Sequence, residues 1–271
     1  MQMPPEYLAQ ETEILLLTAI IPSVRQDFID VGAEQGSFAR FLASKGLRGV
    51  LFEPLPKHQS ALGALAQDLN LKSYSFAIDG TDGEAEFHIA CGENGEELDH
   101  FHSLQRLTQD ARVQHQKSIR VRCRSLNSLY QEGIIGKDVG ILKIDTEGND
   151  LRVLQGLGPV RADVIVCEFF TAGIYSGWTD ACPDKLIKEA KSLGYDDWIA
   201  VRRRSGAELV SLNVESFTDK EWGNLIFFKK PIFSRVWAMV SPIIASADDK
   251  LFSKIESSLI AKTRRRWFSK E

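Results

Sequence analysis

Acidic residues stand at the ends of the apolar segments that the sequence pattern predicts as β-strands: Asp30, Glu53, Asp79, Asp145 and Glu168. In an open parallel sheet, ligands bind at the carboxyl ends of the strands, near the point where the strand order reverses. Carboxylates at such ends suit hydrogen bonds to ligand hydroxyls, ion pairs with an ammonium group, and proton transfer. We therefore expect the functional site among these acids.

The first of these acids precedes a glycine-rich turn in DFIDVGAEQGSFARF, residues 27–41. Backbone N–H groups of such a turn and the following helix N-terminus favour an anionic group. A dinucleotide fingerprint needs G-x-G-x-x-G, but Glu34 stands where the middle glycine would admit a pyrophosphate. Asp30 would repel a pyrophosphate and suits an ammonium group, whereas Glu53 is placed to accept hydrogen bonds from a ribose. S-adenosylmethionine carries a carboxylate, an ammonium and a ribose; a structural turn and a nucleotide site are the alternatives.

The elements that must position these residues alternate between strand and helix. Residues 28–31, 48–54 and 71–79 are predicted strands, separated by helices over 37–46 and 58–70. Between about residues 80 and 130 the pattern changes to two half-buried antiparallel strands, which predict an inserted hairpin or flap. Strands at 138–145 and 162–169 follow, each with a helix after it, and the final strand pair is joined by the charged tip RRRSGAELV. This alternation predicts an α/β fold with a parallel sheet.

Five blocks of the chain resemble, in order, the FkbM family of S-adenosylmethionine-dependent methyltransferases. They are DVGAEQGSFAR, VLFEPLPKHQSAL, AIDGTDGEAEFHI, SLNSL and ILKIDTEGNDLRVLQGL, and they lie between Phe28 and Phe169. The resemblance implies a class I methyltransferase fold: a Rossmann-like three-layer sandwich whose seven-stranded sheet is mostly parallel, with one antiparallel strand and an inserted hairpin. Glu34 departs from the asparagine that is common in the family, and AIDG departs from its ALSD-like block.

The resemblance also implies which residues bind the cofactor S-adenosylmethionine. The methionine end would contact the glycine-rich turn, the ribose would contact the second strand end, and the adenine would lie beside the third strand. Asp145 would lie near the sulfonium and the methyl acceptor. The residues in these roles are Asp30, Gly32, Ala33, Glu34, Gly36, Glu53, Pro54, Ala77, Ile78, Asp79 and Asp145.

Methyl transfer to a hydroxyl requires an aligned acceptor and help with its deprotonation. We take Asp145, Glu147, Lys143 and His102 as the catalytic candidates and assign no metal. In the alternative interpretation Asp145 and Glu147 hold a divalent ion, with Glu168 as a third oxygen ligand. Structural alternatives also stand: Glu147 caps the helix beginning near Asn149, Lys143 pairs with a neighbouring acid, and His100 and His102 are solvated.

Composition fits a soluble globular protein, since 44% of the 271 residues are hydrophobic and 26% are charged. The net charge of −4 gives no reason to expect a nucleic-acid partner. Four cysteines without C-x-x-C spacing and a start without a signal-peptide pattern favour the cytoplasm. We divide the chain into an N-terminal helix (1–26), a methyltransferase domain (27–230, with the insertion) and a helical tail (231–271). The basic tail is either a solvated helix or a contact with an anionic membrane or a partner subunit.

The sequence therefore predicts an S-adenosylmethionine-dependent methyltransferase that O-methylates a hydroxyl of a small molecule or glycan precursor, and it leaves an oligomer open. One alternative is an NAD-dependent oxidoreductase on a Rossmann sheet, against which the missing middle glycine and Asp30 argue. The other is a non-catalytic scaffold that keeps the fold and uses its tail for membranes or partners.

Overall fold

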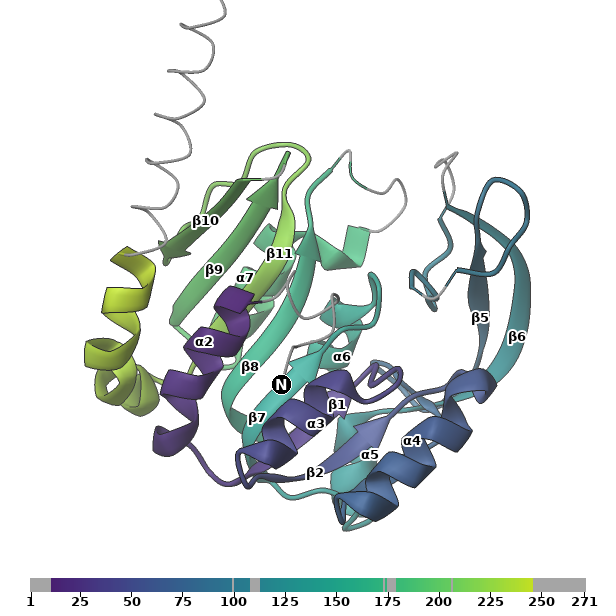
Figure 1. Cartoon of the computed structure of the whole chain (residues 1–271), viewed down its shortest axis with the longest axis horizontal. Helices are drawn as coiled ribbons and strands as arrows, with labels where there is room; N and C mark the ends of the chain where they lie inside the picture. Colours follow the sequence, from purple (N-terminus) through teal and green to yellow (C-terminus); the bar gives the residue numbers. More distant parts are fainter. Residues whose placement is uncertain are drawn as a thin grey trace, which may run out of the picture.

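The computed structural model of the chain describes residues 11–98, 100–107, 113–172, 174, 179–205 and 207–245. Its main sheet has the strand order β10-β9-β11-β8-β7-β1-β2-β3 (Figure 1). The strands are β1 (Asp27–Val31), β2 (Arg48–Phe52), β3 (Lys72–Tyr74), β7 (Asp138–Ile144), β8 (Arg161–Phe170), β9 (Asp197–Arg204), β10 (Ala207–Leu212) and β11 (Trp222–Phe228). The order reverses between β1 and β7, so the carboxyl ends of these two neighbours form the edge at which a ligand is expected.

The main sheet has eight strands among the described residues, not the seven that we predicted. Strands β3, β2, β1, β7 and β8 pair in parallel, and β11 runs antiparallel to both β8 and β9. The extra strand is β10, which pairs antiparallel with β9 at the edge. Most of the segment predicted as a charged tip therefore belongs to the hairpin of β9 and β10, in which Ala207–Leu212 adds an edge strand to the sheet.

Helices cover both faces of this sheet, which makes three layers (Figure 1). One apolar core joins the sheet to α5 (Leu126–Gln131), α6 (Asp150–Gln155) and α7 (Pro183–Ser192). The other core joins it to α2 (Glu11–Ile20), α3 (Ser37–Ser44), α4 (Pro56–Asp68) and a helix over residues 230–245. The three-layer arrangement that we predicted is therefore present.

The insertion forms a small sheet of its own, with the order β4-β6-β5. The long antiparallel pair is β5 (Gly83–Cys91) with β6 (Gln114–Arg124), and β4 (Ala77–Ile78) pairs in parallel with β6. The segment predicted as one third strand is thus divided, because β3 belongs to the main sheet and β4 to the small one. The hairpin stands beside the carboxyl end of the main sheet (Figure 1).

The N-terminal helix α2 is tied to the sheet by a buried ion pair. Both guanidinium NH2 groups of Arg203 in β9 donate to the Glu13 carboxylate, at 2.7 and 2.6 Å. Asn224 of β11 donates to the same carboxylate at 2.8 Å. Arg203, which belongs to the predicted charged tip, is therefore buried against α2.

The part of the tail beyond residue 245 and residues 1–10 lie outside the described residues. Among the described helices, none has the length and apolar character needed to cross a membrane.

Candidate active site

The glycine-rich turn after β1 depends on two glycines for different reasons. Gly32 has φ +76°, and a Cβ there would lie 1.8 Å from the carbonyl oxygen of Asp145. Gly36 has φ +81° and packs on α4, where a Cβ would lie 2.1 Å from a methyl group of Leu65. The N–H groups of Gly32 and Ala33 both donate to the carbonyl of Phe52. The turn is therefore held against both neighbouring strand ends.

Glu34 has φ +49° in this turn, a left-handed conformation that asparagine adopts more readily than glutamate. The asparagine that is common in the resembling family would therefore be less strained here. The Glu34 carboxylate lies 3.8 Å from Nδ1 of His100, and both residues line the same cavity.

Glu53 follows β2 and is held by two backbone donors. Its Oε2 accepts a hydrogen bond from the Glu34 N–H at 2.9 Å, and its Oε1 accepts one from the Leu55 N–H at 2.8 Å. Burial raises the pKa of Glu53 to about 7, although both N–H groups act in the opposite direction. Each carboxylate oxygen keeps a further lone pair, so the group can accept hydrogen bonds from a ligand.

Asp30, Lys143 and Asp145 form a row of charges across β1 and β7. Asp30 and Lys143 are register partners, and the Lys143 Nζ lies 3.6 Å from Asp30 Oδ1 and 3.1 Å from Asp145 Oδ2. Burial raises the pKa of Asp30 to about 6, and the ammonium of Lys143 partly opposes this shift. Burial disfavours the Lys143 ammonium, but the two carboxylates outweigh it and raise the pKa of Lys143. The structural ion pair that we kept open for Lys143 is thus present.

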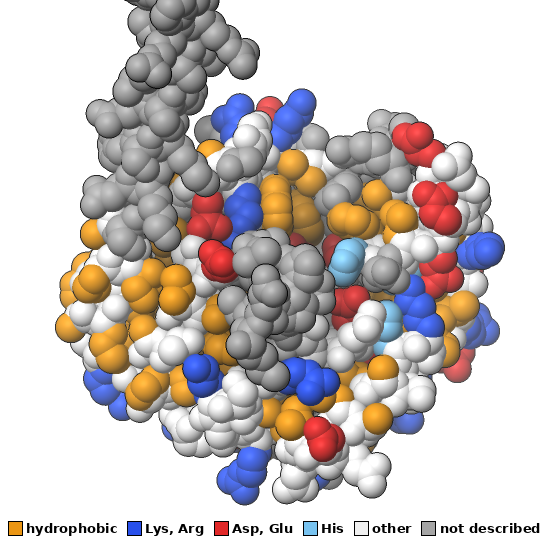
Figure 2. Space-filling view, in the orientation of Figure 1, with side chains coloured by type: hydrophobic (Ala, Val, Ile, Leu, Met, Phe, Trp, Pro, Cys, Tyr) orange, Lys and Arg blue, Asp and Glu red, His pale blue; other side chains and the backbone are white. Residues whose placement is uncertain are grey.

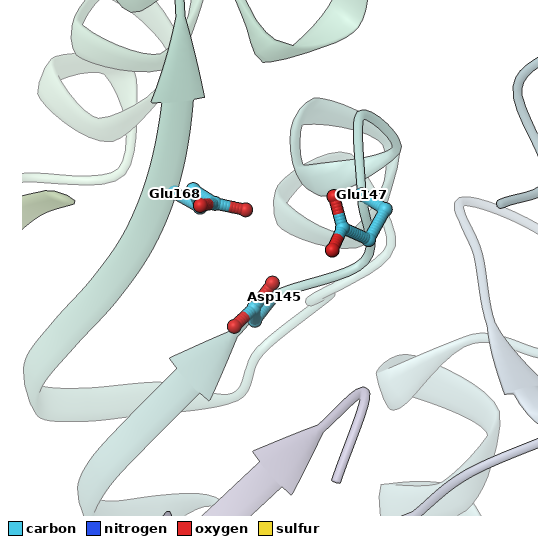
Figure 3. Close-up of side chains that lie close together, drawn as sticks. All are labelled: Asp145, Glu147 and Glu168. Carbon is cyan, nitrogen blue, oxygen red and sulfur yellow. The ribbon is translucent and has the colours of Figure 1, made fainter. Parts of the chain in front are cut away.

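Three further carboxyl groups lie close to Asp145. One carboxylate oxygen each from Asp145, Glu147 and Glu168 lies within 4.8 Å of the other two, and Figure 3 shows the three side chains facing a common space. Asp150 helps to position them, because its carboxylate accepts hydrogen bonds from the Thr146 N–H, the Thr146 hydroxyl and the Glu168 N–H. It thereby joins the loop after β7 to strand β8.

Burial shifts the titration of this acidic group. The pKa of Glu147 rises to about 8 through burial and then through the nearby Asp145 carboxylate. Burial also raises the pKa of Glu168 well above its usual range, and Asp145 adds to the effect. Burial raises the pKa of Asp150 to about 7. At neutral pH some of these carboxyl groups therefore keep their protons.

A loop of the insertion closes over the strand ends. The Phe101 N–H donates to Glu147 Oε1 at 3.2 Å, and Gln105 donates to Asn149 at 3.1 Å. Glu147 therefore contacts this loop, and no side chain caps helix α6 at Asn149. His102 Nδ1 accepts a hydrogen bond from the Ala90 N–H, and its Nε2 lies 3.1 Å from Lys57 Nζ. Burial and then the Lys57 ammonium lower the pKa of His102 to about 4, so its ring is neutral at pH 7.

A cavity between the insertion and the strand ends brings together most of the sequence-predicted residues. Figure 2 shows acidic and histidine side chains close together on this face. Among the described residues, the predicted ones that line the cavity are Gly32, Glu34, Glu53, Pro54, Ala77, Ile78, His102, Asp145 and Glu147. Asp30, Ala33, Gly36, Lys143 and Asp79 are not part of this lining.

Two of the predicted acids therefore face other side chains. The carboxylate of Asp30 is fully buried and faces Lys143. Asp79 accepts hydrogen bonds from the Arg152 guanidinium, at 2.6 and 3.2 Å, and from Asn149 at 3.3 Å. These bonds lower the pKa of Asp79 although burial opposes them. Asp79 thus links the small sheet to helix α6.

Several residues of the cavity wall and one supporting acid were not predicted from the sequence. Leu55, Phe87, Phe101, Leu104 and Thr146 line the cavity. The insertion contributes three of them, and a hairpin pattern does not say which loop residues fold back over the sheet. Asp150 has a usable signal, since it is the second residue after the LKIDTEG block and stands at the start of a helix.

Comparison with known protein families identifies the family of this chain. The sequence model of the FkbM methyltransferase domain matches residues 30–196, more than half of the chain. This range begins at Asp30 and contains every acid of the site described above. No curated protein has a matching sequence.

Solved structures with a similar fold include several methyltransferases. Precorrin-6y C5,15-methyltransferase from Geobacter metallireducens GS-15 is 10% identical with a TM-score of 0.43, over 82% of this chain and 89% of that chain. Magnesium protoporphyrin IX methyltransferase from Synechocystis PCC 6803, solved with bound S-adenosylmethionine, is also 10% identical with a TM-score of 0.43, over 82% of this chain and 79% of that chain. These similarities are too distant to inform the site.

Proposed function

This chain belongs to the FkbM family of methyltransferases, and we propose that it transfers the methyl group of its cofactor, S-adenosylmethionine, to a hydroxyl oxygen of a small molecule or glycan precursor. The family match argues against the alternative of an NAD-dependent oxidoreductase. We infer the methyl acceptor from the residues of the site.

The cavity has the hydrogen-bond acceptors, the apolar wall and the negative charge that this cofactor needs. The Glu53 carboxylate is buried at the wall and held at both oxygens, so it is preorganised to accept ribose hydroxyls. Ala77, Ile78 and Phe87 provide an apolar wall for a purine. Glu34 and Asp145 supply negative charge for an ammonium group. When bound, S-adenosylmethionine supplies an electrophilic methyl group, which is the difficult part of the chemistry.

The position of Asp145 carries the proposal of a hydroxyl acceptor. Its side chain is 28% exposed at the end of β7, on the wall of the cavity that Glu53 also lines. A carboxylate there can accept a hydrogen bond from an acceptor hydroxyl and take up its proton as the oxygen is methylated. Lys143 holds Asp145 from behind through the 3.1 Å ion pair, which fixes the direction of the carboxylate.

The other catalytic candidates have contacts that fit supporting roles. Nδ1 of His102 already accepts a backbone hydrogen bond, and Glu147 accepts one from Phe101. Lys143 is buried behind Asp145 and lies outside the cavity lining. We therefore assign proton uptake to Asp145, and positioning of the loop and of Asp145 to the others.

Charge supports a neutral or cationic acceptor. Glu34, Glu53, Asp145 and Glu147 all line the cavity, and the chain carries a net charge of −4. Such a site repels phosphate-rich acceptors, so nucleic acid is a poor candidate and a polyhydroxylated small molecule or glycan precursor is a good one.

The test is the atom that receives the methyl group. The protein is incubated with ¹³C-methyl-labelled S-adenosylmethionine and a small-molecule extract of the source cells, and the labelled products are examined by NMR. We expect a methyl ether, and we expect Asp145→Asn to reduce its formation at least 100-fold when the cofactor is saturating. Labelled methyl groups on nitrogen or carbon alone would contradict the proposal.

A further inference from the structure

We propose that Asp145, Glu147 and Glu168 form a binding site for a hard divalent cation, in place of the metal-free site that the sequence favoured. One oxygen of each carboxylate lies within 4.8 Å of the others. The three side chains come from the end of β7, the loop after it and strand β8, and they converge on one space (Figure 3). Carboxylate oxygens are the ligands that Mg²⁺, Mn²⁺ and Ca²⁺ prefer.

Glu147 provides an observation independent of this clustering. Its Oε2 is buried and has no hydrogen-bond partner among the described residues. Its other oxygen is held by the Phe101 N–H, which fixes the carboxylate so that it faces Asp145 and Glu168. A buried carboxylate oxygen without a partner is costly, and a cation in the shared space would satisfy it.

The balance of charge leads to the same conclusion. Together with Asp150, the three acids form a group of four carboxyl groups. Among the described residues, Lys143 is the cation that forms an ion pair with this group, through Asp145. Lys143 also faces Asp30, so its single positive charge is shared. Asp150 already accepts three hydrogen bonds, whereas Asp145, Glu147 and Glu168 each direct an oxygen toward the shared space, so we take these three residues as the ligands.

The spacing of the three oxygens allows them to share one cation. Ligands across an octahedral Mg²⁺ are about 4.2 Å apart, and those across Ca²⁺ about 4.6 to 5.2 Å. At most one pair of the three oxygens can lie across the ion from each other, so three oxygens within 4.8 Å of one another can hold a single Mg²⁺, Mn²⁺ or Ca²⁺ ion after an inward rotation of the side chains. Three protein oxygens leave coordination positions for water or for an acceptor.

The cation also has a consequence for the reaction, which rests on the proposed function. A hydroxyl coordinated beside Asp145 would have a lowered pKa, so the cation would assist the same deprotonation. An acceptor with two neighbouring oxygens, such as a vicinal diol, would chelate it. Binding of the cation itself does not depend on this step.

The experiment uses the full chain freed of metal with a chelator. Mn²⁺ is titrated and its free fraction is followed by electron paramagnetic resonance, with Mg²⁺ and Ca²⁺ as competitors. We expect one site per chain and at least a tenfold weaker site in Glu168→Gln, whose carboxyl group lies outside the cavity lining. Glu84→Gln removes an exposed carboxylate paired with Arg120 on the hairpin and should bind like the wild type.

Thermal unfolding provides a second measurement on the same variants. Mn²⁺ should raise the melting temperature of the wild type and of Glu84→Gln but not that of Glu168→Gln, which should be at least as stable as the wild type in chelator. Equal Mn²⁺ affinity in wild type and Glu168→Gln would overturn the cation site. Calorimetry with S-adenosylmethionine in chelator is run in parallel, so a failed cation site with normal cofactor binding is distinguished from a failed cofactor site.

Discussion

The ammonium of Lys143 lies 3.6 Å from the carboxylate of Asp30, and both side chains are buried at adjacent positions of β1 and β7. Both Asp30 oxygens lack a hydrogen-bond partner among the described residues, so Lys143 is their main electrostatic compensation. The acid at the first strand end therefore sets the position of Lys143, and Lys143 in turn holds Asp145.

Replacing Lys143 with methionine should leave Asp30 buried without a counter-charge. Removing one partner of a buried pair costs about 3 kcal/mol, and we expect this loss in the free energy of unfolding at pH 8. The loss should be smaller at pH 5, because Asp30 then takes up a proton. Urea denaturation at both pH values measures it.

The double variant Asp30→Asn with Lys143→Met is the matched control for this charge pair. It removes both charges, so it should recover at least half of the lost stability at pH 8. Equal losses in the single and double variants would show that packing, rather than charge, explains the effect.

Glu53 should make stability fall as pH rises. Its pKa is about 7 in the folded chain and near 4.5 when unfolded, so folding retains a proton between these values. The stability of the wild type should therefore decrease relative to Glu53→Gln between about pH 4.5 and 7, by about 3 kcal/mol. Denaturation curves across this range measure the difference, and parallel curves for the two proteins would refute the shift.

Alanine substitutions at Gly32 and Gly46 distinguish the stability cost of a steric clash from the cost of backbone strain. Both have positive φ, +76° and +89°, but a Cβ at Gly46 meets nothing within 4 Å. Gly46→Ala should cost about 1 kcal/mol from the left-handed conformation alone. Gly32→Ala should cost at least about 2 kcal/mol more, because its Cβ displaces the Asp145 carbonyl. Similar losses in the free energy of unfolding for both variants, measured by chemical denaturation, would contradict the close approach of Gly32, after β1, to Asp145, after β7.

Glu13→Ala should detach helix α2 from the sheet edge. It leaves Arg203 buried with only part of its ion pairing, through Glu208. We expect a loss of about 3 kcal/mol in the free energy of unfolding, against less than about 0.5 kcal/mol for the exposed neighbour in Glu11→Ala. Losses of the same size in both variants would mean that α2 contributes little through this pair.

Local patterns predicted the central part of the fold well. The glycine turn, the alternation of strands and helices, and the half-buried pattern of the insertion each follow from neighbouring residues, and the matching elements are present. The eighth strand was missed because RRRSGAELV has the composition of an exposed tip. Its Arg203 is buried against Glu13, which is 190 residues away in the chain, so no local pattern indicates this contact.

The site was predictable in its residues and less so in their contacts. The acids at strand ends can be recognised in the sequence because they follow apolar segments. Asp145 and Glu168 lie close together because β7 and β8 are adjacent parallel strands. That Asp79 bonds Arg152 and that Phe101 reaches Glu147 depend on how the insertion packs, which a single sequence does not encode in any local pattern.

Binding of S-adenosylmethionine is the sharpest test of the proposed cofactor site, because it shows whether Glu53 contacts the cofactor. Isothermal titration calorimetry at pH 8 compares the wild type with Glu53→Gln and with the exposed control Glu84→Gln. A hydrogen bond to a charged acceptor contributes about 1.5 to 3 kcal/mol, so Glu53→Gln should bind at least tenfold more weakly while the control binds like the wild type. If Glu53→Gln binds S-adenosylmethionine as tightly as the wild type does, Glu53 does not belong to the cofactor site.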